Sequence, residues 1–236
     1  MKKHKGYTLV EMVISIAVGL LIIAVIYAAV NMGQRSTVNV ERKVAAHQDA
    51  RAALGLMVLE IQMASFNPTY ATGVWVAPGD CTTASGNQNY RGIQAATDSS
   101  ISVEADINEN GSVAKIIVAG ENINPNEIIT YSYDAANQYI TRKTGCGNAQ
   151  AFLGDSPTSG NPRAVRVINT TAVPVFRYFD AQGTDITAQL PAGIPNIARI
   201  DITLWVETED KDPNSGLRRR MVYSTSVIPR NHVIKQ

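Results

Sequence analysis

An uncharged apolar run near the N-terminus constrains this 236-residue chain more than any other feature of its sequence. Residues 12–30 carry no charged side chain and are mostly apolar. As a helix they would be roughly 28 Å long, close to the ~30 Å hydrocarbon core of a bilayer. The alternative is a buried helix of a soluble protein, but such helices rarely lack a polar stripe over this length. The run therefore predicts a membrane-spanning helix.

Charged residues precede this run in two places. The leader, residues 1–5, is basic, and its positive charge predicts that it stays in the cytoplasm while the rest of the chain crosses the membrane. Glu11 stands directly before the uncharged run. A carboxylate in the hydrocarbon region costs roughly 2.5 kcal/mol or more, so we expect Glu11 to be paired or functional.

The leader differs from an ordinary secretory signal, in which the cleavage site follows the apolar stretch. The segment Gly6-Tyr7-Thr8-Leu9-Val10-Glu11 resembles the class III leader of type IV prepilins, whose usual form is Gly-Phe-Thr-Leu-Ile-Glu. The resemblance implies that prepilin peptidase cleaves between Gly6 and Tyr7 and that the new amino group of Tyr7 is methylated. Tyrosine replaces the commoner phenylalanine and keeps an aromatic ring at that position.

The same resemblance implies a role for Glu11 in assembly. In the pilin family the equivalent glutamate of an incoming subunit meets the N-terminal amine of its neighbour. Such an attraction is strong in a low-dielectric setting and can set the axial register of packed helices. The alternative is that Glu11 caps the first helical turn and interacts with the positive end of the helix dipole.

Residues 31–67 are predicted to continue the helix, since no proline occurs before Pro68 and the residue before a proline disfavours helix. An apolar stripe recurs at helical spacing and predicts one face buried against a sheet. The positions of the stripe, which Arg51 interrupts, are Val40, Val44, His47, Leu54, Val58 and Ile61. A tighter pattern in its second half comprises Leu54, Met57, Val58, Ile61 and Ser65. We interpret His47 as a partly exposed structural residue.

Residues 68–236 are predicted to form one globular, β-rich domain, because short alternating segments are separated by Gly-, Asn- and Pro-containing turns. The expected fold class is α+β and pilin-like, with a long hydrophobic N-terminal helix packed on an antiparallel sheet. Irregular loops are expected over 77–100 and 144–163. The expected strands are 101–107, 113–118, 127–133, 138–143, 164–168, 173–180, 200–207 and 217–228.

The two cysteines, Cys81 and Cys146, lie in the two expected loops. Both would face the oxidising side of the membrane, which predicts a disulfide between them. Many major pilins use cysteines to close a loop near the C-terminus, and this chain does not, which favours a minor pilin or pseudopilin. The segments 175–183 and 206–231 also resemble the PilW type of minor pilin.

Two polar motifs outside the leader have a possible chemical role. Asp106, Asn108 and Asn110 match the first half of a calcium loop, but the twelfth position, which needs an acid, is Ile117. The alternative is a polar hairpin turn, and no metal site or cofactor is predicted. The run 218–220 is three arginines, which would suit DNA or anionic lipid. On a strand they point to alternate faces, so nucleic acid is not expected as a partner.

The sequence does not predict an enzyme. It contains no HExxH, CxxC, G-x-S-x-G, P-loop or G-x-G-x-x-G motif. Removing residues 1–6 takes away three lysines and leaves 18 basic and 20 acidic residues, since the full chain has 21 and 20. The mature chain would therefore have no basic field to attract nucleic acid.

These features predict four parts: a leader at 1–6, a membrane and filament-core helix at 7–30, its amphipathic continuation at 31–67, and the domain at 68–236. The first hypothesis is a minor pilin of the PilW type that helps to prime or assemble type IV pili. Its implied partners are prepilin peptidase, other minor pilins, the major pilin, membrane lipid and the inner-membrane assembly platform. Its N-terminus would be cytoplasmic and its domain periplasmic, before transfer to the pilus at the cell surface.

Two other hypotheses stay open at this point. A pseudopilin of the type II secretion system, of the J type, would carry the same leader and helix. A membrane-anchored receptor would display the same domain for a ligand without polymerising.

Overall fold

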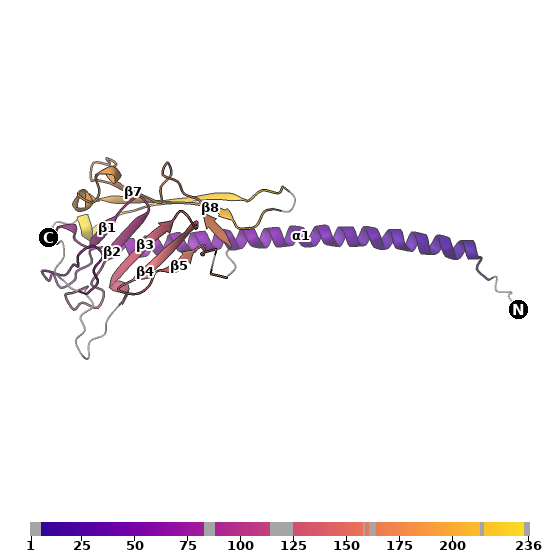
Figure 1. Cartoon of the computed structure of the whole chain (residues 1–236), viewed down its shortest axis with the longest axis horizontal. Helices are drawn as coiled ribbons and strands as arrows, with labels where there is room; N and C mark the ends of the chain where they lie inside the picture. The colour runs from indigo at the N-terminus through magenta and orange to yellow at the C-terminus, as the bar shows by residue number, and fades with distance from the viewer. Residues whose placement is uncertain are drawn as a thin grey trace.

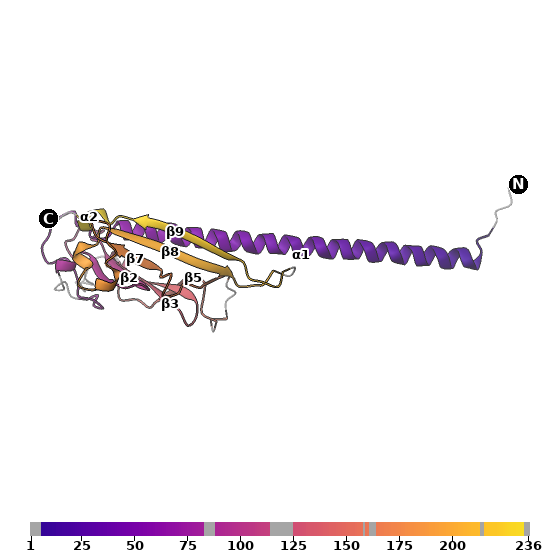
Figure 2. The ribbon, with the colours of Figure 1, turned by 90° about the horizontal axis from the view of Figure 1, so that it is seen from above.

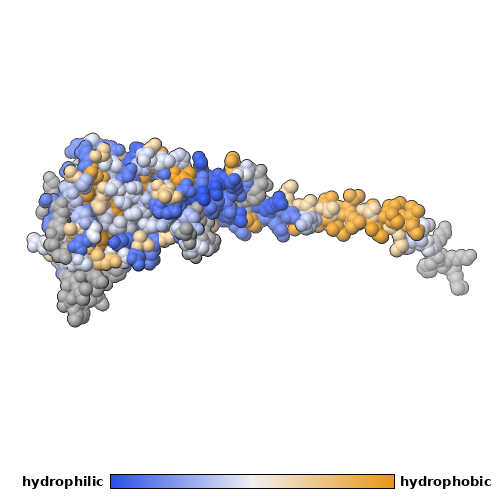
Figure 3. Space-filling model, in the orientation of Figure 1, coloured by the Kyte–Doolittle hydropathy of each residue, from blue (hydrophilic) through white to orange (hydrophobic). Residues whose placement is uncertain are grey.

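The computed structural model describes residues 6–82, 88–113, 125–157, 159–160, 164–212 and 215–233. A single long helix, α1 (Leu9–Gln62), projects from one end of a β-rich head (Figure 1). The projecting part of α1 is hydrophobic near its N-terminus and polar where it approaches the head (Figure 3). The head packs only on the C-terminal part of α1, and this confirms the predicted α+β, pilin-like architecture.

The first sheet has five antiparallel strands in the order of the sequence, so each strand pairs with the next one along the chain. Its strands are β1 (Ile93–Ala96), β2 (Ser100–Glu104), β3 (Ile128–Asp134), β4 (Tyr139–Thr144) and β5 (Gln150–Leu153).

The second sheet is built around its longest strand, β8 (Arg199–Thr208). One edge of β8 pairs with β6 (Val165–Val167) and β7 (Phe176–Phe179), and its other edge pairs with β9 (Arg220–Val227). Seen from above, β8 and β9 lie beside α1 (Figure 2). Short helices complete the head: η1 (Gln88–Tyr90), η2 (Pro125–Glu127), η3 (Thr187–Gln189), η4 (Ile194–Asn196) and α2 (Arg230–Val233).

The helix face that packs on the sheets is lined mostly by alanine. It begins further along the helix than the predicted stripe. Val40 and Val44 are 56% and 48% exposed, because the helix enters the core only at Ala46. Small side chains let the strands approach the helix closely. Of the predicted positions, Met57, Ile61 and Ser65 are buried, and Leu54 and Val58 are partly buried against the core. The buried face consists of Ala46, Ala50, Ala53, Met57, Ile61 and Ala64.

The helix ends at Gln62, before the predicted end at Asn67. Ser65 adopts a left-handed backbone conformation with φ 67°, and its N–H donates to the carbonyl of Glu104 at 2.8 Å. Gly92 lies against this turn, since a Cβ there would come within 2.6 Å of the Ser65 backbone. Pairing with the end of β2 therefore stops the helix before the proline does.

Two strands lie inside regions predicted to be irregular. β1 falls within 77–100 and β5 within 144–163, so both loop predictions were wrong at these places. Neither strand alternates strongly in hydrophobicity, and each forms by pairing with the edge of a neighbouring strand. The expected strand 113–118 is not observed at Val113, which lies in a loop, and its remaining residues lie outside the described part of the chain.

The C-terminal helix α2 is held to the end of α1 by His232, which is fully buried. Its Nδ1 lies 2.9 Å from the carbonyl of Arg91 and 3.1 Å from the hydroxyl of Ser65, and its Nε2 lies 2.9 Å from the carbonyl of Ile194. One imidazole therefore connects α1, the start of β1 and η4. No apolar periodicity surrounds this residue, so its burial was not predictable from the sequence.

Candidate processing and assembly site

The motif that precedes α1 forms a helix cap. Thr8 is the N-cap residue, with extended backbone angles, and its hydroxyl accepts a hydrogen bond from the N–H of Glu11 at 3.3 Å. The Glu11 carboxylate in turn accepts from the N–H of Thr8 at 2.9 Å and from its hydroxyl at 3.0 Å. This reciprocal capping box explains locally why a Thr-x-x-Glu sequence begins the helix here.

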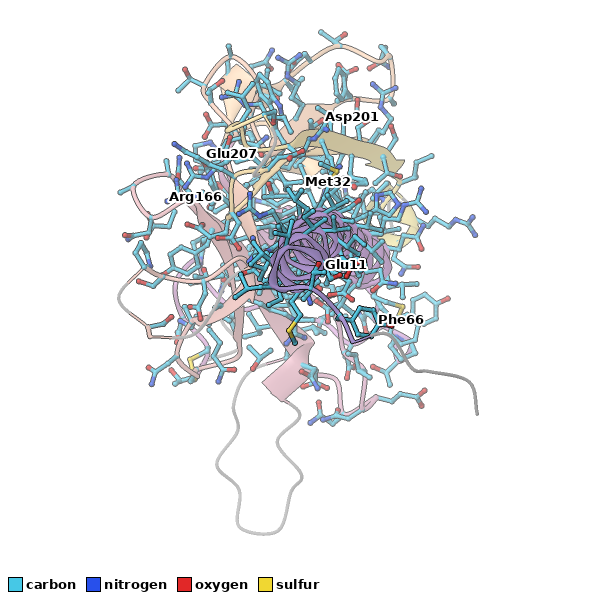
Figure 4. The ribbon with its side chains drawn as sticks, turned by 90° about the vertical axis from the view of Figure 1, so that its right-hand side faces the viewer. Glu11, Met32, Phe66, Arg166, Asp201 and Glu207 are labelled. Atoms are coloured by element: carbon cyan, nitrogen blue, oxygen red, sulfur yellow. A yellow bond between two sulfur atoms is a disulfide. The ribbon has the colours of Figure 1, made fainter. Side chains whose placement is uncertain are left out.

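The two oxygens of Glu11 differ in their contacts. Both bonds from Thr8 go to Oε2, whereas within the described residues Oε1 accepts no hydrogen bond. Glu11 therefore does cap the first helical turn, the alternative role that its position predicts. It uses one oxygen and leaves the other open toward the surroundings. Figure 4, which looks along α1 from its N-terminal end, shows Glu11 at the near end of the helix.

The predicted cleavage site is exposed. Tyr7 is 89% exposed, and no atom lies within 4 Å of the position that a Cβ on Gly6 would take. Residues 6–8 precede the helix without regular structure. Among the described residues, no contact would thus keep a peptidase from the peptide bond between Gly6 and Tyr7.

The apolar run lies along the projecting part of α1. This is the one helix among the described residues that is long and apolar enough to cross a membrane, and none of its apolar window is buried by the head. Large side chains point outward all around it; Leu9, Leu21 and Val25 are each at least 67% exposed. In water such a surface would be strongly unfavourable, so it requires lipid or other helices around it.

The predicted disulfide is confirmed. Cys81 and Cys146 are joined, with their Cα atoms 5.5 Å apart across a sequence separation of 65 residues. Cys81 follows the segment that leaves α1, and Cys146 lies in the turn between β4 and β5. The bond therefore ties the segment that follows the helix to the first sheet.

The calcium candidates form a turn that is bonded internally. The carboxylate of Asp106, which is fully buried, accepts the N–H groups of Asn110 at 3.1 Å and Gly111 at 2.9 Å. Asn108 accepts the N–H of Asn110 at 3.0 Å. The twelfth position, Ile117, lies outside the described residues. Within the described ranges, no group of three or more His, Cys, Asp or Glu side chains is gathered for a metal.

The arginine run lies at the start of β9 and is balanced by acids. Arg219 pairs with Asp212 at 3.3 Å and Arg220 with Glu207 at 3.3 Å. Arg218 lies 3.8 Å from Glu209. These guanidinium groups thus share their charge with acidic neighbours of the same hairpin.

Comparison with known proteins gives one match. Residues 1–27 match the model of the prokaryotic N-terminal methylation motif. Neither the curated proteins nor the solved structures gave a match. The matched segment contains the cap, the cleavage site and most of the apolar run described above. With its long N-terminal helix packed on antiparallel sheets, the chain is pilin-like in architecture, and it carries the class III methylation motif that prepilin peptidase processes.

Proposed function

We propose that this protein is a minor pilin of the PilW type that helps to prime or assemble type IV pili. The observation that carries the proposal is the N-terminal site: an exposed Gly6–Tyr7 bond, a membrane-length apolar helix, and a glutamate with one oxygen open. The PilW assignment draws on the resemblance of segment 206–231, which comprises the end of β8, β9 and the start of α2.

Cleavage after Gly6 gives the site its chemistry. It frees an ammonium group on Tyr7, the residue next to the cap, and this amine is then methylated. Thr8 holds Oε2 of Glu11 within the same chain, so the ammonium of a neighbouring subunit binds Oε1. In the low dielectric around packed apolar helices this attraction is much stronger than in water, and it sets the register of one subunit against the next.

The proposed site explains the order of events in the membrane. The basic leader keeps the N-terminus in the cytoplasm, where the exposed cleavage site is cut, while the disulfide-bonded head folds in the periplasm. The assembly platform then moves the helix from lipid into a bundle of pilin helices. Other minor pilins and the major pilin supply the neighbouring subunits. Their helices cover the apolar surface that the head leaves exposed.

Two measurements test this function. Mass spectrometry of the protein from its native host should find a chain that begins with methylated Tyr7, and Gly6→Ala should block this cleavage. Glu11→Ala should leave cleavage intact and remove the protein from purified pili. Ser15→Ala is the matched control, because Ser15 lies one turn further and only donates to the Glu11 carbonyl at 2.8 Å. A mature chain that still begins with Met1, or normal pilus content of the Glu11 variant, would contradict the proposal.

A further inference from the structure

The outer edge of β9 is a long strand edge to which no other described strand is paired. On its inner side β9 pairs with β8 through eight consecutive residue pairs, from Ile200–Val227 to Glu207–Arg220, without a bulge. Within the described residues no other strand pairs with it. In Figure 2, β9 is the outermost strand of the second sheet along α1.

The register shows which backbone groups face outward. The N–H of Thr208 donates to the carbonyl of Arg219 at 3.0 Å, so Glu207 and Arg220 form a pair that exchanges no hydrogen bonds. Because the pattern alternates, every second residue of β9 directs its N–H and C=O away from β8. None of these groups has a backbone partner in the described part of the chain, and all four residues are exposed: Arg220, Val222, Ser224 and Ser226.

This edge lacks the features that usually prevent strand pairing. Natural edge strands are commonly short, bulged, or interrupted by proline or lysine. β9 has an unbroken register, no proline before Pro229, and no lysine. Residues 221–227, Met-Val-Tyr-Ser-Thr-Ser-Val, are uncharged and rich in strand-forming types. Such an edge binds extended chains through main-chain hydrogen bonds.

A pocket lies at one end of the same edge. It has a volume of about 430 Å³ and lies between α1 and β9, where Val44 and Met221 give it apolar walls. Lys43, Arg219 and Arg220 also line it. The two arginines pair with acids of their own hairpin, whereas Lys43 has no acidic partner among the described residues. The pocket therefore suits an acidic side chain with an aliphatic stem, such as glutamate.

The strand direction bears on which subunit can bind. α1 and the strand β9 both run away from the membrane end of the molecule (Figures 1 and 2). Two copies of this chain joined antiparallel through β9 would point their α1 helices in opposite directions. Helices inserted in one membrane with the same orientation exclude that antiparallel pairing. A parallel pair of two β9 strands would bring no acid to the pocket, since residues 220–227 contain none, which favours a different subunit.

We propose that the β9 edge binds an extended strand of a different pilin-like subunit, with an acidic side chain of that strand in the Lys43 pocket. This inference rests on the proposed function, because it needs neighbouring subunits in the same membrane. The subunits would then be joined in two ways, by the packing of their helices and by a β-sheet shared between their heads. The pocket selects the partner strand, because main-chain hydrogen bonds form with a strand of any sequence.

Photocrosslinking in the native host tests the contact. A benzoylphenylalanine at Ser224 should form an adduct with one pilin-like subunit, located by mass spectrometry in an extended segment that contains an acid. The same probe at Gln182, an exposed residue in the turn after β7, should form none. An adduct between two copies of this chain, equal adducts at both positions, or no adduct at Ser224 would overturn the proposal.

Two variants separate edge pairing from simple proximity. Val222→Pro removes one outward N–H and leaves the hydrogen bonds to β8 in place, since the N–H of Val222 does not belong to that ladder. It should lower the Ser224 adduct about tenfold or more, an effect of one lost hydrogen bond plus ring hindrance. Lys43→Glu, which leaves β9 unchanged, should lower it as well and should be rescued by an acid-to-lysine change in the partner segment. An adduct undiminished in Lys43→Glu would exclude the pocket.

Failure of this inference is distinguishable from failure of the proposed function. Pilus content of the wild-type and Glu11→Ala proteins measures the function. The Ser224 adduct is measured separately in membranes of the Gly6→Ala variant, where the uncleaved protein stays anchored. If pilus incorporation is lost while the Ser224 adduct is normal, the defect lies in the Glu11 contact and the β9 contact is intact. Normal incorporation without the adduct shows that the chain assembles but not through β9.

Discussion

Arg142 on β4 binds Glu60 on α1 through two hydrogen bonds, 2.6 Å from Nη2 to Oε1 and 3.1 Å from Nε to Oε2. The side chains are only 23% and 14% exposed. The hydroxyl of Tyr131 on β3 donates to the same carboxylate, and burial together with this carboxylate raises the pKa of Tyr131. A single helix carboxylate thus holds two neighbouring strands of the first sheet.

Replacing Glu60 with alanine should destabilise the head by about 2–3 kcal/mol, because it leaves the Arg142 guanidinium and the Tyr131 hydroxyl without their common partner. The free energy of unfolding of the full chain in detergent, from urea titration, is the measurement. Asp210→Ala is the control, since its pair with Arg42 is exposed at 58% and 47% and should contribute less than about 1 kcal/mol. Equal losses in the two variants would contradict the importance of burial.

Removing the disulfide should destabilise the protein by about 4 kcal/mol, from the loop-closure entropy of a 65-residue separation. The double variant Cys81→Ser, Cys146→Ser should unfold at a lower urea concentration than the oxidised wild type. Reduction of the wild type should lower its stability to that of the variant, and the variant itself should not respond to reductant. A response of the variant would mean that the reductant acts elsewhere.

The buried His232 should make the head sensitive to mild acid. Burial lowers the pKa of His232 below its ordinary 6.5, despite the carbonyls of Arg91 and Ile194. As the pH falls below 6.5, the unfolded chain takes up a proton that the folded protein does not, so the stabilisation present above this pH is lost. In His232→Gln the free energy of unfolding should fall less steeply between about pH 7 and pH 5 than in the wild type. An equal slope in both would assign the acid sensitivity to other groups.

Glu104 should have the opposite effect. It is 1% exposed, and burial raises its pKa to about 8 from 4.5, although the N–H of Val76 donates to it at 3.4 Å. The folded protein therefore holds a proton that the unfolded chain releases above pH 4.5. Its stabilisation is lost as the pH rises through about 8, by up to about 1.4 kcal/mol per pH unit.

The Glu104→Gln variant checks this, since glutamine keeps the acceptor and stays neutral at every pH. Its free energy of unfolding should decline less steeply with pH than that of the wild type between about pH 4.5 and pH 8, because His232 and Glu127 keep their own contributions in both proteins. Burial also raises the pKa of Glu127. The pH dependence of the free energy of unfolding in Glu127→Gln can therefore be compared with that in Glu104→Gln. A Glu104→Gln protein that still loses stability with the wild-type slope would show that Glu104 is ionised in the fold.

The sequence predicted well those features whose cause is local. The apolar run depends on composition alone and needs no contact with the head. The cap depends on residues three apart, and it entered as the alternative role of Glu11, without Thr8 as its partner. The strand β8 alternates without interruption and was expected over 200–207 against the observed Arg199–Thr208. The pairing of Cys81 with Cys146 followed because the chain has only these two cysteines.

Features that depend on contacts distant in sequence were not predictable in this way. β1 and β5 take their strand form from neighbouring edges, and the helix ends early because Ser65 bonds to Glu104. The alanine face of α1 was not predicted, because alanine is only weakly hydrophobic and adds little to an apolar pattern. Its small side chain nevertheless lets strands come close to the helix. His232 has no local signal, since its partners are backbone carbonyls far along the chain.

The amino-acid sequence by itself determined how this protein is anchored and processed, because the cleavage motif, the helix cap and the apolar run act within a few turns of one helix. Only the tertiary structure decided which face of that helix the head covers, which carboxylates and which histidine are buried, and that β9 is the last strand of the second sheet among the described residues. Burial and strand order arise from packing between distant segments, and no local pattern of residues encodes them.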